Sequence, residues 1–137
     1  MNPQTCLEAR NELFLYTLAQ PRPPFIHQLA VDAYSAQHLR ENATPITKLF
    51  PLMGLFMVCE QGATGLEVQM AHKRKAGDVD RKNWPNPPIH PSPFLMNVGD
   101  VLRETEGLDR DRAIHKWVVS TWASYAYIHD IIRAFCS

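Results

Sequence analysis

The residues best suited to chemistry in this sequence lie together in one stretch, from Phe25 to His38, which reads FIHQLAVDAYSAQH. Two histidines, an aspartate, a tyrosine and two glutamines stand there among mostly apolar residues. Histidine and aspartate serve as metal ligands and as acid–base catalysts, and tyrosine can also transfer protons. In a helix, His27 and His38 lie on one face but roughly 16 Å apart along the axis. They cannot both bind one metal ion, so another element must complete any such site.

The last helical stretch of the sequence repeats this arrangement. His115 and His129 share a face with Trp122 and lie about 21 Å apart along the axis. If the two histidine-bearing helices pack side by side, one histidine from each can meet, with an aspartate as an oxygen ligand or as the group that orients an imidazole. We therefore predict a site for a divalent metal such as zinc between these two helices. Its expected ligands are His27, Asp32, His38 and His129, and its pocket is expected to include Tyr34, Gln37 and Trp122.

A structural interpretation of the same residues stays open. Histidine and tyrosine side chains inside helical bundles often form hydrogen bonds that only stabilise the fold. The chain would then be a non-enzymatic binding or dimerising protein, in which the apolar third helix, Trp117 and Trp122 form an interface between two copies. A small-molecule pocket without a metal is a third hypothesis, and it would be lined by Tyr34, Met53, Phe56, Trp122 and Tyr125. No catalytic residue and no reaction follow from the sequence, so enzymatic activity is an open question.

Helices must position these residues, because the sequence shows helical apolar spacing and helix caps but no sustained alternation of apolar and polar residues. Thr64 and Glu67 have the spacing of a capping box, and Thr44-Pro45 is a typical helix start. Pro51 should kink or break the helix that it interrupts. The sequence thus predicts a single all-α domain, residues 1–137, built as a bundle of five or six helices. The expected helices are 5–20, about 24–39, 44–60, 64–77, 97–104 and 109–135, with an irregular proline-rich segment near 78–96.

Apolar residues predict how two of these elements attach to the bundle. Leu7, Phe14 and Leu18 have the spacing of one helical face, so they should form the buried side of the first helix. The proline-rich segment contains a single tryptophan, Trp84, which should fix the segment to the helices.

The overall composition argues against several classes of protein. The chain has 137 residues with 14 basic and 14 acidic side chains, whereas nucleic-acid-binding proteins usually carry a basic excess. The three cysteines form no Cys-x-x-Cys pair, so we expect free thiols in a reducing, cytoplasmic compartment. The N-terminus does not resemble a signal peptide, and the longest apolar run, 49–59, is too short to cross a bilayer. Neither nucleic acid nor a membrane is an expected partner, whereas a homodimer and a small-molecule ligand stay open.

The order H-x-L-x-V-D-x-Y-x-x-Q-H, from His27 to His38, resembles the motif of a bacterial family of uncharacterised proteins, a domain of unknown function. Family members often begin with a Cys-x-x-Cys-Gly segment, where this chain has Cys6 alone, and many carry a histidine where this chain has Pro51. The resemblance implies that the four predicted metal ligands belong to one functional or structural unit, but it implies no reaction. Shorter segments that resemble the same family follow in the same order along the chain. They are Met53-Gly54-Leu55, Glu60-Gln61-Gly62, Trp84, Pro87-Pro88, Asp100-Val101-Leu102, Trp117, Trp122 and His129.

Overall fold

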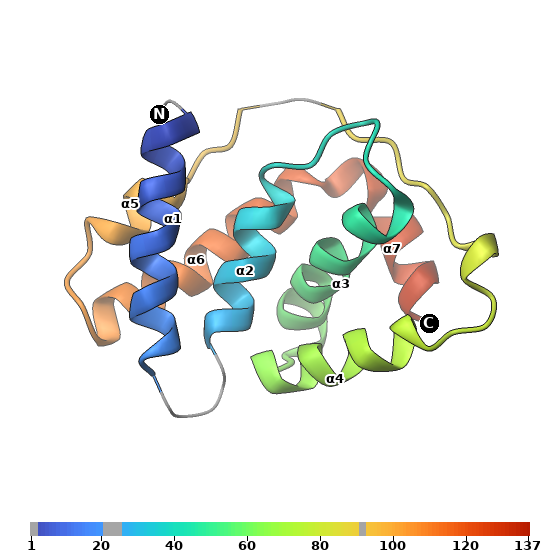
Figure 1. The fold of residues 1–137 in the computed structure, drawn as a ribbon, viewed down its shortest axis with the longest axis horizontal. Helices are drawn as coiled ribbons and strands as arrows, with labels where there is room; N and C mark the ends of the chain where they lie inside the picture. The colour runs from blue at the N-terminus through green and yellow to red at the C-terminus, as the bar shows by residue number, and fades with distance from the viewer. Residues whose placement is uncertain (1–2, 21–25, 91–92) are drawn as a thin grey trace.

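The computed structural model of the chain describes residues 3–20, 26–90 and 93–137, and in these ranges it contains α-helices, two 3-10 turns and no strand. The predicted all-α class is therefore confirmed (Figure 1). None of the helices in the described part of the chain is long and apolar enough to span a membrane. The elements are α1 (Pro3–Leu18), α2 (Ile26–Ala36), α3 (Pro45–Gln61), α4 (Gly65–Ala76), η1 (Arg81–Asn83), α5 (Val98–Leu102), α6 (Leu108–Ser124), η2 (Ala126–Ile128) and α7 (His129–Cys136).

Local capping interactions begin and end the central helices where the sequence predicts. The Thr44 hydroxyl accepts a hydrogen bond from the backbone N–H of Thr47 at the start of α3. Gly62 ends the same helix in the left-handed conformation, with a φ of 66°, which glycine adopts without steric cost. Thr64 and Glu67 form both hydrogen bonds of the predicted capping box of α4.

Other boundaries differ from the prediction. The helix that contains Pro51 continues through it, so the predicted break is absent. The predicted last helix is divided into α6 and α7 at Tyr125, whose backbone leaves the helical conformation. The hydroxyl of this buried tyrosine donates a hydrogen bond to the carbonyl of Ala36 at the end of α2, which ties the break to another helix. The predicted start of the second helix, residues 24–25, lies outside the described residues.

The first helix buries a different face from the one predicted. Leu7 and Leu18 are exposed by 45% and 63%, whereas Ala9, Leu13 and Thr17 are buried. The small side chains of Ala9 and Thr17 let α1 lie against its neighbours, while Leu7 and Leu18 of the predicted stripe face outward. Only Phe14 of the predicted stripe packs against the core, and it does so partly exposed.

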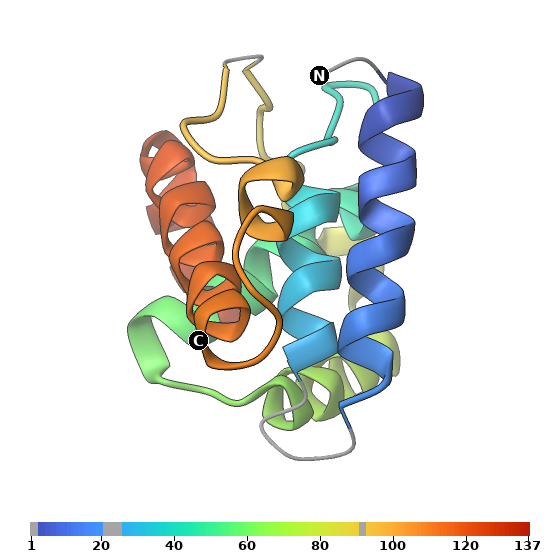
Figure 2. The same ribbon diagram turned by 90° about the vertical axis from the view of Figure 1, so that its left-hand side faces the viewer.

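Helix α2 lies at the centre of the bundle and packs against α1, α3, α4 and α6 (Figures 1 and 2). Its residues Ala30, Ala33 and Ala36 are completely buried, and their small side chains let neighbouring helices approach closely. Large apolar side chains from the surrounding helices fill the rest of the core. The most deeply buried of them include Leu13, Leu49, Leu52, Leu55, Ile114, Trp117, Ile128 and Ile132.

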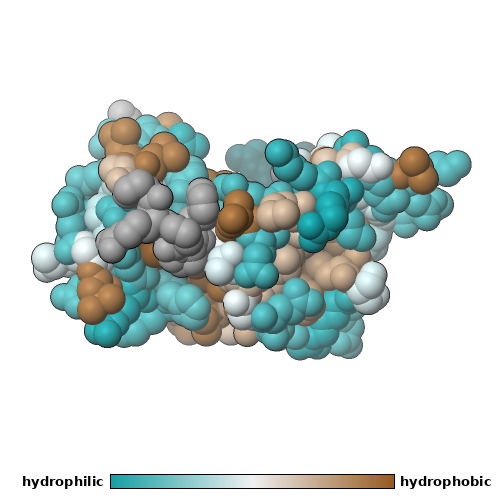
Figure 3. Space-filling model, turned by 90° about the horizontal axis from the view of Figure 1, so that it is seen from below, coloured by the Kyte–Doolittle hydropathy of each residue, from teal (hydrophilic) through white to brown (hydrophobic). Residues whose placement is uncertain are grey.

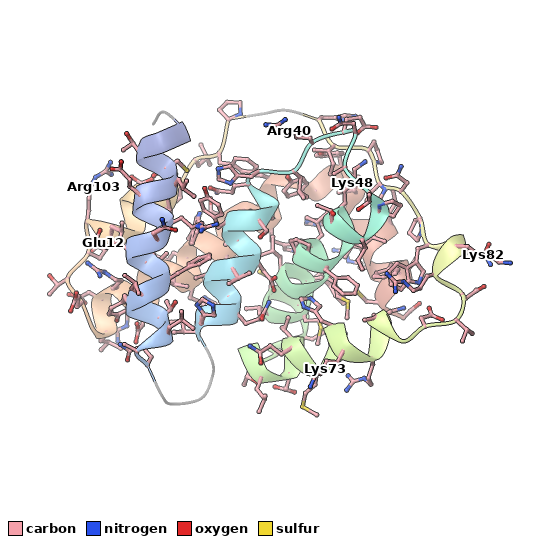
Figure 4. The ribbon with its side chains drawn as sticks, in the orientation of Figure 1. Glu12, Arg40, Lys48, Lys73, Lys82 and Arg103 are labelled. Atoms are coloured by element: carbon pink, nitrogen blue, oxygen red, sulfur yellow. The ribbon has the colours of Figure 1, made fainter. Side chains whose placement is uncertain are left out.

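The proline-rich segment is fixed to the bundle by two anchors. Trp84 packs against Phe50 and Phe135, as its position in the sequence predicts. The second anchor is Lys48 of α3, whose side chain is completely buried at the end of the helix near this segment (Figure 4). Its ammonium donates hydrogen bonds to the Asn86 side-chain oxygen (2.9 Å) and to the Pro87 carbonyl (3.1 Å).

Replacing Lys48 by methionine should destabilise the protein by about 2–3 kcal/mol, because two acceptors would lose a charged donor. Urea unfolding followed by circular dichroism measures this change. The matched control is Lys82→Met in the exposed η1 turn (Figure 4), which should change the free energy of unfolding by less than about 0.5 kcal/mol. Equal effects of the two substitutions would show that the buried ammonium is not an anchor.

Candidate functional site

A cavity of about 600 Å³ opens between α1, α2, α3 and α4. Its size falls within the range of small-molecule binding sites, and its wall combines apolar and aromatic side chains with several polar groups, as such sites usually do. The residues that line it are Arg10, Phe14, Gln28, Val31, Asp32, Tyr34, Ser35, His38, Leu39, Ile46, Thr47, Phe50, Pro51 and His72.

The acidic group of this cavity is Asp32, which is only 4% exposed. One carboxyl oxygen accepts a hydrogen bond from the Gln28 amide at 3.0 Å. The other oxygen lies against Gly54 of α3, where an added Cβ would fall 1.9 Å from it. Burial raises the pKa of Asp32 well above its ordinary value, so the site favours the protonated, neutral carboxyl.

His38, two residues after the end of α2, is held at the cavity by the backbone of that helix. Its Nδ1 lies 2.7 Å from the Tyr34 carbonyl, and because a carbonyl can only accept, Nδ1 carries the proton. The ring also stacks on the Tyr34 ring, with centroids 4.1 Å apart. In the neutral imidazole, Nε2 therefore keeps its lone pair, and this nitrogen lies 3.4 Å from the Cys6 sulfur.

A second histidine of the cavity wall is His72, which lies in α4. Its Nε2 donates to the Phe50 carbonyl at 2.9 Å, and its ring stacks on the Phe50 ring. Burial lowers the pKa of His72, an effect that this hydrogen bond partly offsets, so the neutral ring is favoured. In the sequence His72 precedes three basic residues, Lys73, Arg74 and Lys75, which give no sign that its own ring is partly buried.

The structure separates the four predicted metal ligands. Asp32 and His38 line the cavity, whereas His27 and His129 do not. His27 Nδ1 bonds to the Thr17 hydroxyl at 2.8 Å, and His129 Nε2 donates to the Trp122 carbonyl at 2.7 Å. Among the residues that the structure describes, no group of three or more histidine, cysteine or acidic side chains could hold a metal ion.

The predicted pocket residues are separated in the same way. Tyr34 lines the cavity. Gln37 instead donates to the Met96 carbonyl (2.7 Å) and to the Thr121 hydroxyl (3.0 Å), so it joins α2 to α6. Trp122 donates its indole N–H to Glu60 at 3.0 Å and stacks on the His129 ring. Gln37 and Trp122 therefore hold helices together at a distance from the cavity.

Sequence reasoning missed two residues of α1: Arg10, which lines the cavity, and Cys6, which contacts the cavity residue His38. Together with Phe14 they stand four residues apart, which places all three on one helical face. This spacing was the available signal, but the more apolar stripe of Leu7 and Leu18 concealed it. Cys6 is 32 residues from its partner His38, so only the packing of α1 against α2 brings the two side chains together.

The chain belongs to a family of unknown function, DUF5946, whose profile matches residues 1–126. This finding agrees with the resemblance of the His27–His38 motif to an uncharacterised family, and it supplies no reaction. No curated protein matches the chain, and no solved structure matches it. The geometry of the cavity is therefore the main evidence on function.

Replacing Gly54 by alanine should destabilise the protein by about 1–3 kcal/mol, because the new methyl group would overlap the Asp32 carboxyl and force α2 and α3 apart. The control is Gly77→Ala, where a Cβ would meet its nearest neighbour, the Arg74 carbonyl, at an ordinary 3.6 Å. Urea unfolding of both variants measures the difference. Adding Asp32→Ala to Gly54→Ala should recover part of the loss, and strictly additive effects would contradict a direct contact.

The raised pKa of Asp32 predicts a specific pH dependence of stability. The native state binds the carboxyl proton more tightly than the unfolded state, so this stabilisation is complete below the unfolded pKa of about 4 and is lost as pH rises. Wild type should therefore lose stability relative to Asp32→Asn as pH rises above about 4. Asp78 has a lowered pKa, chiefly because it accepts the backbone N–H of Asp80, so wild type should lose stability relative to Asp78→Asn as pH falls. Urea unfolding from below pH 4, where the Asp78 effect falls, to above pH 7 tests both signs. A pH-independent difference for Asp32→Asn would contradict the assignment.

Proposed function

We propose that the protein binds a small organic molecule with an anionic group, such as a carboxylate, in the cavity between α1, α2, α3 and α4. The observation that carries this proposal is Arg10, a cation at the cavity with which no acidic side chain in the described ranges forms an ion pair. Among the residues that the structure describes, the hydrogen-bond acceptor of the guanidinium is the amide oxygen of Asn11, at 3.1 Å from Nε and 2.8 Å from Nη2. Its remaining donors can serve a ligand, and arginine binds carboxylates through paired N–H groups.

Aromatic rings hold Arg10 in position for this role. Its guanidinium lies over the Phe14 ring, 5.2 Å from the centroid, and near the Tyr34 ring, 5.7 Å from the centroid. Cation–π contacts restrict a long side chain without neutralising its charge. Because both rings line the cavity, they keep the positive charge at its wall.

The charges of the other lining residues support an anionic ligand. Asp32 is the one acidic side chain among the described residues of the wall, and its raised pKa favours the neutral form. The lowered pKa of His72 favours a neutral ring. Arg10 therefore gives the cavity a positive balance, while Phe14, Ile46 and Phe50 offer apolar surface to the rest of the ligand.

The earlier hypotheses of a zinc-type site and of a homodimer receive no comparable support. The predicted metal ligands His27, Asp32, His38 and His129 have separate partners, as described above. Trp117 and Trp122 are buried within the chain, so they are not free to form an interface. The underside of the molecule shows hydrophobic residues in small groups among hydrophilic ones (Figure 3). Leu66 and Met70 of α4 are exposed by 41% and 50%. Metal analysis and light scattering would test these two hypotheses directly.

Thermal unfolding in the presence of simple acids tests the proposal. 3-Phenylpropionate, octanoate and phenyl phosphate should raise the melting temperature of the wild type, and 3-phenylpropionamide should not, because the amide lacks the charge that pairs with Arg10. Arg10→Met should weaken binding of the best acid by about tenfold or more, since a hydrogen bond to a charged group contributes about 1.5–3 kcal/mol.

The matched control for this experiment is Arg40→Met, because Arg40 is exposed and does not line the cavity (Figure 4). This variant should bind the same acids with unchanged affinity. The proposal fails if none of the acids stabilises the wild type, or if Arg10→Met and Arg40→Met bind them equally well.

A further inference from the structure

We propose that Cys6 is a nucleophilic thiol activated by His38, and that it reacts with small hydroperoxides to form a sulfenic acid. This inference does not depend on the proposed binding of an organic acid, because the thiol and its base are complete without a ligand. It assigns a modification site to a residue that the sequence shows only as an isolated cysteine.

The first observation is the pairing of the thiol with a correctly oriented base. The Cys6 sulfur lies 3.4 Å from His38 Nε2, within hydrogen-bonding distance for sulfur. The hydrogen bond from Nδ1 to the Tyr34 carbonyl fixes the tautomer, so Nε2 is the nitrogen that can take the thiol proton. A nucleophile, a base and a group that orients the base are the recurring parts of activated thiols.

The second observation is the set of groups that surround the Cys6 sulfur. Cys6 lies in the first turn of α1, where the helix dipole stabilises negative charge. Burial raises the pKa of the Tyr34 phenol, and a hydrogen bond with Cys6 raises it further, so the hydroxyl stays protonated and can donate to the sulfur. Arg10 lies one helical turn after Cys6 and adds a positive charge on the same face.

The other two cysteines provide a contrast within the same chain. Burial, together with the charge of Glu60, raises the pKa of Cys59 to about 11, and burial raises that of Cys136 to about 11. Both thiols therefore remain protonated at neutral pH and react slowly. Neither has the histidine contact that distinguishes Cys6 among the described residues.

The proposed step is balanced in atoms and electrons. His38 Nε2 accepts the proton of Cys6, and the sulfur lone pair attacks the terminal oxygen of the hydroperoxide. The S–O bond forms as the O–O bond breaks, and the departing alkoxide takes the proton from the imidazolium to leave as an alcohol. The sulfur is oxidised by two electrons to sulfenic acid, and the peroxide is reduced by two electrons.

The test uses the full chain, exposed briefly to limiting hydrogen peroxide at pH 7 with dimedone present to trap sulfenic acid. Mass spectrometry of the digest then measures the labelling of each cysteine. Cys6 should be labelled at least about tenfold faster than Cys59 and Cys136. His38→Asn should slow the labelling of Cys6 about tenfold or more, and His115→Asn, at an exposed histidine of α6, should leave it unchanged.

Two further measurements separate the role of the base from an effect on folding. In His38→Asn, Cys59 and Cys136 should stay slow, which shows that the fold is intact. Tyr34→Phe keeps the backbone carbonyl and the ring but removes the hydroxyl, so it should slow the labelling of Cys6 several-fold. Equal labelling of all three cysteines in the wild type would overturn the proposal. Unchanged labelling of Cys6 in a folded His38→Asn variant would also overturn it.

Discussion

The close contact between α2 and α3 at Asp32 and Gly54 determines the geometry of this protein. An added Cβ on Gly54 would fall 1.9 Å from the Asp32 carboxyl, so the two helices meet at a distance that only glycine permits. The same contact excludes water from the carboxyl and raises its pKa. A single packing constraint thus sets both the spacing of the central helices and the charge of the cavity beside them.

The two sides of helix α2 contact different parts of the protein. One side is fixed to α6 and to the segment before α5 by the hydrogen bonds of Gln37, and its end is fixed by the Tyr125 hydroxyl. The other side carries Asp32, Tyr34 and His38 toward the cavity. A rigidly anchored helix is a suitable support for a binding site, because side chains on it keep their positions without a ligand.

Capping chemistry made the helices themselves predictable, since the signals at Thr44 and Thr64 are local in the sequence. The site was less predictable, because helical spacing shows which residues share a face but not which helix covers that face. His27 of α2 and His38, just after its end, have their partners Thr17 and Cys6 in α1. His129 instead donates to the Trp122 carbonyl, seven residues earlier in the chain. His72 was missed because its neighbours are basic, although its own ring is partly buried against Phe50.

The central claim is that Arg10 binds an anionic group in the cavity beside a neutral Asp32. Nuclear magnetic resonance of protein labelled with ¹⁵N tests it most directly, by following the Arg10 side-chain Nε–H signal during titration with 3-phenylpropionate. If Arg10 binds the acid, its signal should shift and reach saturation, and backbone amides around the cavity in α1 to α4 should shift with it. An unchanged Arg10 signal, or shifts scattered over the surface without saturation, would contradict it.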